Sequence, residues 1–246
     1  MSRFITKEAN PHGLYSVALF DRGMPVEIVV DDKFPCYPDT KSALFTKPKG
    51  TEAWVMIMEK AFCKLHGSYT LPESGYSMKA LENINGCPAE ELDNDDMEPE
   101  ENWKKIYEFD QKKFIMTCSP RSGQNKSETG LVSGHAYTLI SAFEVEGVRL
   151  LRIRNPWGGG EWKGDYSDSS DKWTDSLKKA VGYVDENDGS FFMTFDDFRK
   201  HYSSFSVGYF HDDYIYKYWK DNFHPRHANY YKFTISETTS VYFRGH

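Results

Sequence analysis

A histidine and an asparagine are the side chains best placed to do chemistry in this sequence. His135 stands at the start of one apolar run, and Asn155 follows a second run at residues 148–154, after a tight charged turn at 144–147. Two such runs joined by a short turn predict a β-hairpin. Because an antiparallel pairing brings the start of one strand beside the end of the next, we expect His135 and Asn155 to meet at one edge of a sheet.

A histidine oriented by an asparagine forms the base half of a Cys-His-Asn nucleophilic site. The Asn155 amide would accept the imidazole N–H, fix the tautomer and hold the ring toward a thiol. Trp157 lies two residues beyond Asn155 and would stand beside the pair. The alternative is that His135 is a structural residue of its strand, which is the commoner role of a single histidine.

The sequence around these residues resembles the second half of the calpain protease core. The resemblance rests on Gly-His-Ala-Tyr at residues 134–137 and Arg-Asn-Pro-Trp-Gly at 154–158, and it extends over roughly residues 13–210. It implies that His135 is the catalytic base, that Asn155 orients it, and that Trp157 is a supporting residue that shields their hydrogen bond from water. It also implies that the substrates are proteins.

The same resemblance implies a calcium site built by two acidic loops, residues 164–171 and 185–190, together with Glu161. The implied ligands are the side chains of Glu161, Asp168 and Asp188 and the backbone carbonyl of Glu186. Calcium prefers several such oxygen ligands, and the spacing of an EF-hand is absent. Ser190 stands where the family often has glutamate, so we expect weak binding. Two solvated acidic loops without a metal remain the open alternative.

Composition narrows the class of protein. The chain has 246 residues, a net charge of −7, 39% hydrophobic residues and 16% aromatic residues. An acidic balance argues against non-specific binding to nucleic acid. No apolar run is long enough to span a membrane, and the first residues lack the apolar core of a signal peptide. We therefore expect a cytoplasmic protein with a core rich in aromatic side chains.

No cysteine occupies the position of a nucleophile. The four cysteines show no metal-binding spacing and are expected to be reduced and buried: Cys36, Cys63, Cys87 and Cys118. In calpains the nucleophile stands in a Gly-Asp-Cys-Trp context that precedes everything recognised here, and the glutamine of the oxyanion hole lies further upstream. The chain is therefore expected to begin after that segment and to be inactive alone.

The remaining sequence predicts a mixed set of elements. We expect a hairpin at 14–30, helices at 52–65, 77–83, 103–113 and 194–202, and strands at 114–118 and 206–210. Residues 88–102 hold eight acidic residues and are interpreted as a solvated, partly disordered insertion rather than a metal site. The polar loop at 119–132 leads to His135 and could either line a substrate channel or be a plain connector.

These features predict an α+β, papain-like cysteine protease fold, that is, a calpain core lacking its N-terminal part. Residues 1–75 would be the remainder of the first core subdomain, and residues 76–212 the second subdomain, which carries the histidine and the asparagine. Residues 213–246 would begin a C2-like β-sandwich, with strands at 230–236 and 239–243. Contacts between that domain and the core are expected if the chain continues.

The favoured function is a calcium-dependent cysteine endopeptidase of the calpain type, represented here by a chain without its catalytic cysteine. The alternative is a catalytically dead calpain-like module that acts in peptide or protein binding or in regulation. A structural domain that merely responds to calcium is a third reading. The presence or absence of a Gly-x-Cys-Trp segment upstream would separate the first two.

Overall fold

The computed structural model describes residue 5 and residues 10–48, 50, 52–70, 75–222, 226 and 228–246. Its contacts divide the chain into two compact units, one from residues 1–88 with 215–246 and the other from residues 89–214. The predicted segments instead end at residues 75 and 212. Their identity as calpain subdomains stays a prediction, and each unit is described by itself below.

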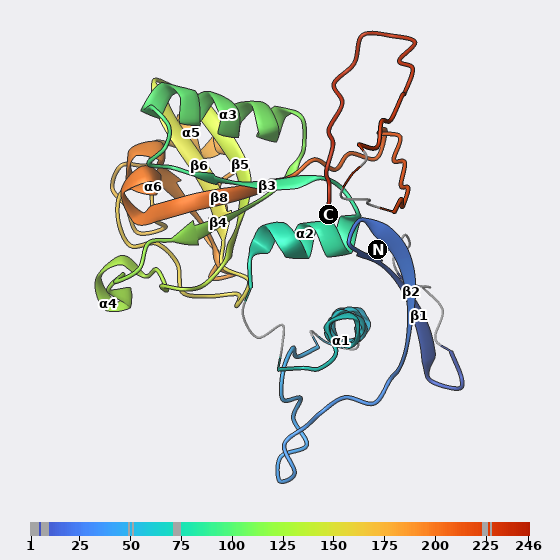
Figure 1. Cartoon of the computed structure of the whole chain (residues 1–246). Coiled ribbons are helices and arrows are strands. Elements are labelled where there is room, and N and C mark those ends of the chain that lie inside the picture. Colours follow the sequence, from blue (N-terminus) through green and yellow to red (C-terminus); the bar gives the residue numbers. More distant parts are fainter. Residues whose placement is uncertain are drawn as a thin grey trace. The chain divides into compact units, whose positions relative to one another are not determined.

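The unit of residues 89–214 is built on a six-stranded sheet (Figure 1). Its strands follow the order β3-β8-β4-β5-β6-β7, and every neighbouring pair is antiparallel. The strands are β3 (Ala89–Asp93), β4 (Ile115–Pro120), β5 (Tyr137–Val145), β6 (Val148–Arg154), β7 (Ser190–Thr194) and β8 (Tyr202–Gly208). Strands β5 and β6 form the predicted hairpin beside His135 and Asn155, with Val145 paired to Val148 across its turn.

Helices cover both faces of this sheet because its strands carry apolar side chains on both sides. On one face, Trp103 of α3 (Pro99–Gln111) donates a hydrogen bond to Glu144 of β5 and meets the ring of Phe195 at 5.2 Å. Phe195 is the first residue of α6 (Phe195–His201), so α3 and α6 share that face. On the other face, α5 (Asp175–Val181) packs Leu177 against Leu150. Alternation along a strand places Leu150 and its neighbour Arg149 on opposite sides.

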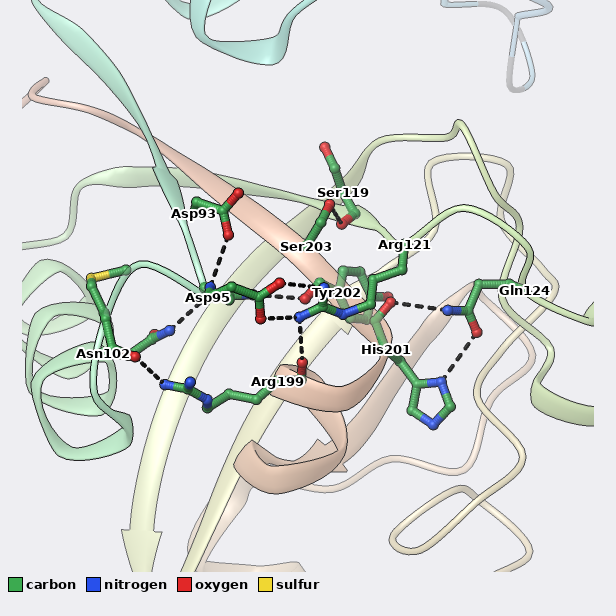
Figure 2. Close-up of polar contacts among 12 residues, drawn as sticks. Asp93, Asp95, Asn102, Ser119, Arg121, Gln124, Arg199, His201, Tyr202 and Ser203 are labelled. Carbon is green, nitrogen blue, oxygen red and sulfur yellow. Dashed lines mark hydrogen bonds and ion pairs between the residues drawn. The ribbon is translucent and has the colours of Figure 1, made fainter.

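The interpretation of residues 88–102 as a solvated insertion is wrong. They form the edge strand β3 and the first turn of α3, with a link that holds both to the sheet. Asn94 and Asn102 are fully buried. The amide nitrogen of Asn102 donates to the side-chain oxygen of Asn94, and the amide nitrogen of Asn94 donates to the carbonyl of Tyr202. Figure 2 shows the adjoining ion pair, in which Arg121 donates two hydrogen bonds of 2.6 Å to Asp95.

The first unit contains the predicted N-terminal hairpin, β1 (Leu14–Asp21) and β2 (Met24–Asp31), paired in antiparallel register. Helix α1 (Trp54–His66) packs Ile57 and Ala61 against the hairpin, and α2 (Ser77–Asn85) contacts β1. The described residues of 215–246 form no helix or strand, so the strands expected at 230–236 and 239–243 are not formed here. The start of a β-sandwich there stays a prediction.

Several elements agree with the sequence, and others were not anticipated. The helices predicted at 77–83, 103–113 and 194–202 correspond to α2, α3 and α6, and Thr194 caps α6 by accepting from the backbone N–H of Asp197. Helix α5, the short α4 (Lys126–Thr129) and strand β7 were not predicted. Across the described part of the chain, every helix is too short or too polar to cross a bilayer.

Candidate active site

The β5–β6 hairpin brings His135 and Asn155 together. His135 lies two residues before β5 and Asn155 directly follows β6, while the register pairs Thr138 with Arg154. Antiparallel pairing therefore puts the residue before one strand beside the residue after the other. The His135 Nε2 and Asn155 Oδ1 atoms are 2.9 Å apart, which confirms the predicted contact.

The asparagine is held in one orientation by its own turn. Its amide nitrogen donates to the carbonyls of Gly159 and Gly160 at 2.8 and 3.1 Å, and its Oδ1 accepts from the backbone N–H of Trp157 at 3.1 Å. Asn155 is fully buried. Because the amide N–H groups are committed to carbonyls, the oxygen must face the histidine and accept from it.

This orientation decides which nitrogen of His135 can act as a base. Since Asn155 Oδ1 can only accept, the neutral imidazole carries its proton on Nε2. The lone pair of Nδ1 is then left for a proton from another group. The sequence had predicted that an asparagine would fix the tautomer, and the geometry adds which tautomer it is.

The ring of Trp157 packs against His135, as predicted. Its ring lies 4.1 Å from the His135 ring at an interplanar angle of 32°, and 63% of the residue is exposed. Tyr137 contacts the other part of the imidazole edge-on at 5.0 Å. The ammonium of Lys126 lies 5.7 Å from the Trp157 ring centre, a cation–π contact that the sequence did not reveal. The imidazole is therefore held between two aromatic rings.

The surroundings of Cys118 and Cys63 do not favour a thiolate. Cys118 is the one cysteine in the unit of residues 89–214; it is 1% exposed, and burial raises the pKa of its thiol well above the usual 9.0. Burial also raises the pKa of Cys63. A nucleophilic cysteine needs the reverse, a thiolate stabilised by a nearby cation or base. Cys36 is exposed, whereas Cys87 is buried, as was expected of all four.

A hairpin that presents a histidine, its orienting asparagine and a covering tryptophan defines the base half of a Cys-His-Asn hydrolase site. Comparison with known proteins agrees with this class. A family model described as "Calpain family cysteine protease" matches residues 2–209. The chain therefore belongs to the calpain family of cysteine proteases, and its mixed α+β fold contains a calpain catalytic domain.

Similar proteins come from plants and animals. Calpain-type cysteine protease ADL1 of Oryza sativa subsp. japonica is 38% identical over 213 residues, which cover 82% of this chain and 10% of the relative. Calpain-9 of Homo sapiens is 31% identical over 208 residues, covering 79% of this chain and 30% of the relative. Calpain-14 of Homo sapiens is 34% identical over 197 residues, covering 77% and 28%. The chain thus spans less than a third of each of these relatives.

The structure brings part of the proposed calcium set together. Burial, and then the neighbouring carboxylates of Glu161 and Asp185, raise the pKa of Asp168 to about 6. Such crowding of acidic groups is what a bound cation would relieve. Glu161 also accepts from the backbone N–H of Gly189 at 2.7 Å, which holds it at the second loop. Glu161 and Asp168 therefore lie near each other, and their role as ligands of a cation stays a prediction.

The other two expected ligands take part in hydrogen bonds of the second loop. The Asp188 carboxylate accepts from the backbone N–H of Ser190 at 2.7 Å, and this bond lowers the pKa of Asp188. The carbonyl of Glu186 accepts from the backbone N–H of Asp188. Within the described ranges, no three His, Cys, Asp or Glu side chains gather closely enough to hold a metal. The complete ligand set stays a prediction.

Proposed function

We propose that this chain supplies the base half of a calpain-type, calcium-dependent cysteine endopeptidase that cleaves protein substrates in limited proteolysis inside the cell. The observation that carries the proposal is the 2.9 Å contact between His135 and Asn155 beneath Trp157. The membership of the family supports it, and the roles of the three residues come from the resemblance.

In this reaction His135 would move the proton twice. Its Nδ1 lone pair takes the proton of a cysteine thiol, and the thiolate attacks the peptide carbonyl. The imidazolium then returns the proton to the leaving amine as the C–N bond breaks. Asn155 accepts from Nε2 throughout and keeps the ring aimed, while Trp157 covers this hydrogen bond on the solvent side. The nucleophile itself must come from residues other than the four cysteines.

The second candidate is a calpain-like module without catalysis, acting in protein binding or regulation. The burial of Cys118 and the raised pKa of its thiol favour this candidate for the chain taken alone. A transcript reaching upstream of Met1 separates the two, because an in-frame Gly-x-Cys-Trp segment favours the enzyme and its absence favours the module. In a longer protein with that segment, His135→Ala should abolish peptide hydrolysis, whereas Ser203→Ala, a substitution elsewhere in the sheet, should not.

The 246-residue chain itself should neither cleave peptides nor present an activated thiol. With iodoacetamide at neutral pH, we expect the exposed Cys36 to react at the rate of an ordinary thiol. Cys36→Ser should then leave the folded chain almost unlabelled, and His135→Ala should change nothing. A fast-reacting cysteine whose rate falls in the His135→Ala variant would mean that one of the four is the nucleophile after all.

Calcium would bind through Glu161 and Asp168, with Asp188 and the carbonyl of Glu186 completing the shell. When bound, it would supply positive charge that fixes the two acidic loops. Binding to the folded state alone should raise the melting temperature at about 10 mM calcium, with magnesium less effective. Asp168→Asn should remove the increase. An unchanged melting temperature in the parent chain would mean that the loops are solvated acidic loops.

A further inference from the structure

The loop that precedes His135 is closed at its base. The loop runs from Arg121 to Gly134, and the hydroxyl of Ser133 donates to the carbonyl of Arg121 at 3.3 Å. The same hydroxyl accepts from the backbone N–H of Gln124 at 2.8 Å. Ser133 is two residues from His135. The hydrogen bonds that close the loop therefore also fix the position of the His135 backbone.

The closed end of this loop is hydrogen-bonded to His201, the last residue of α6. Its carbonyl accepts from the backbone N–H of Arg121 at 2.8 Å and from the side-chain amide of Gln124 at 3.2 Å. Its ring Nδ1 lies 3.1 Å from Gln124 Oε1, and Figure 2 shows both contacts of the Gln124 side chain, one with the carbonyl of His201 and one with its ring. Since the Gln124 amide nitrogen is the donor to the carbonyl, Oε1 is the acceptor and Nδ1 carries a proton.

His201 also contacts the segment that follows Asn155. The imidazole packs against the ring of Trp162 at 4.9 Å, and Trp162 is buried. A second link ties the same two segments, because the backbone N–H of Lys163 donates to the carbonyl of Thr129 at 3.1 Å. His201 therefore contacts both the loop before His135 and the segment that follows Asn155.

We propose that Gln124 and His201 are positioning residues that set the placement of His135 against Asn155 and Trp157. This inference rests on the proposed function of the pair and extends it to residues outside the site. The catalytic histidine and its orienting asparagine share a single hydrogen bond, so their relative position depends on how the two supporting segments are joined. The Gln124–His201 contact and the His201–Trp162 packing join them.

This link does not depend on the protonation state of His201. Burial, and then the neighbouring Lys200, lower the pKa of His201, whereas Asp197 acts in the opposite direction. The neutral imidazole already carries its proton on Nδ1, and a second proton on Nε2 would leave the bond to Gln124 intact. The link is therefore present in both protonation states of His201. A variant at Gln124 or His201 should displace His135 at any pH where the chain is folded.

The placement of His135 can be read by NMR without a substrate. The Trp157 ring, 4.1 Å away, shifts the Cε1–H and Cδ2–H resonances of His135 by its ring current, and Trp157→Ala gives the values without it. In the 246-residue chain, Gln124→Leu removes both side-chain contacts to His201 at similar volume. His201→Phe keeps a ring against Trp162 but loses the donor, and His201→Asn keeps a donor near the place of Nδ1 but loses the ring.

We expect Gln124→Leu and His201→Phe to move the His135 resonances toward their Trp157→Ala values. His201→Asn keeps a donor for Gln124, so it should move the His135 resonances less than His201→Phe does. Ser203→Ala is the matched control, because it removes a hydroxyl bonded to the carbonyl of Ser119 at 3.2 Å, a bond that involves neither Gln124 nor His201 (Figure 2). Its urea midpoint shows what the loss of one such bond costs, and Gln124→Leu, which loses two, should have a somewhat lower midpoint.

Two results separate the inference from the function on which it rests. If Trp157→Ala moves the His135 resonances but Gln124→Leu leaves them where they are in the parent chain, the positioning role is refuted and the proposed site stands. If Trp157→Ala itself moves nothing, the stacked site behind the proposed function is absent. A shift in Gln124→Leu no larger than that in Ser203→Ala also overturns the positioning role.

Discussion

Replacing Asn155 by alanine should destabilise the chain far more than replacing His135, although the two residues share one hydrogen bond. Asn155 makes three further side-chain hydrogen bonds within its own turn, to the carbonyls of Gly159 and Gly160 and from the N–H of Trp157. At about 1 kcal/mol net for each hydrogen bond, the turn alone loses roughly 3 kcal/mol. Solvent can reach the carbonyl of the exposed Gly160 and offset part of this, so the expected loss is about 2–3 kcal/mol.

His135→Ala should cost only about 1 kcal/mol. It removes the bond to Asn155 and the packing of a half-buried ring between Trp157 and Tyr137. Urea unfolding followed by tryptophan fluorescence tests the difference. The signal reports mainly on the unit of residues 89–214, because four of the six tryptophans lie there: Trp103, Trp157, Trp162 and Trp173.

The double variant provides the coupling between the two side chains. Since only one of the four bonds of Asn155 is to His135, we expect a coupling energy of about 1 kcal/mol or less. If Asn155→Ala cost no more than His135→Ala, the bonds within the turn would not be holding the asparagine. The argument that these bonds fix its orientation, and with it the tautomer of His135, would then be refuted.

Two further predictions follow from glycine geometry and from charge. Gly130→Ala should destabilise the chain far more than Gly134→Ala. Both glycines have positive φ, at +80° and +66°, but a Cβ at Gly130 would lie 1.8 Å from the carbonyl oxygen of Glu161. Gly134 has open space around it, so Gly134→Ala should cost only the backbone strain of about 1 kcal/mol. Equal urea midpoints for the two variants would contradict the contact between loop and turn. The hydrogen bonds from Arg121 hold the pKa of Asp95 below its usual 3.8, so their contribution to stability is present above about pH 4 and is lost as the pH falls below it. Asp95→Asn should therefore be less stable than the parent chain at pH 7 and approach it in acid, and a difference that persists unchanged at about pH 2 would rule the ion pair out as its cause.

The hairpin and the contact of His135 with Asn155 could be predicted from the sequence because both follow from local rules. Two apolar runs around a tight turn determine an antiparallel pair, and the positions of His135 and Asn155 at its open end are then fixed. The order of the other strands has no such local signal. Strand β8 lies between β3 and β4, although 108 residues separate Asn94 beside β3 from Tyr202 of β8, whose carbonyl it contacts.

The acidic segment shows why composition misleads at such long-range contacts. Eight acidic residues within 88–102 suggest a solvated chain, and many of these carboxylates are indeed at the surface. The segment is ordered by its other residues, because Asn94 and Asn102 are buried and hydrogen-bonded and Trp103 packs under the sheet. Buried asparagines are stabilised only by partners. Asn102 bonds to Asn94, but Asn94 bonds to the carbonyl of Tyr202 in β8, which a local reading of 88–102 does not include.

The same limit applies to the site itself. The sequence identifies the two residues that would handle the proton, but their geometry depends on groups that carry no motif of their own. Asn155 is oriented by the carbonyls of two glycines, and the loop before His135 is attached to His201 through Gln124. A search for catalytic side chains passes over a backbone carbonyl and a glutamine. These groups nevertheless decide whether Nδ1 of His135 keeps its lone pair free and where that lone pair points.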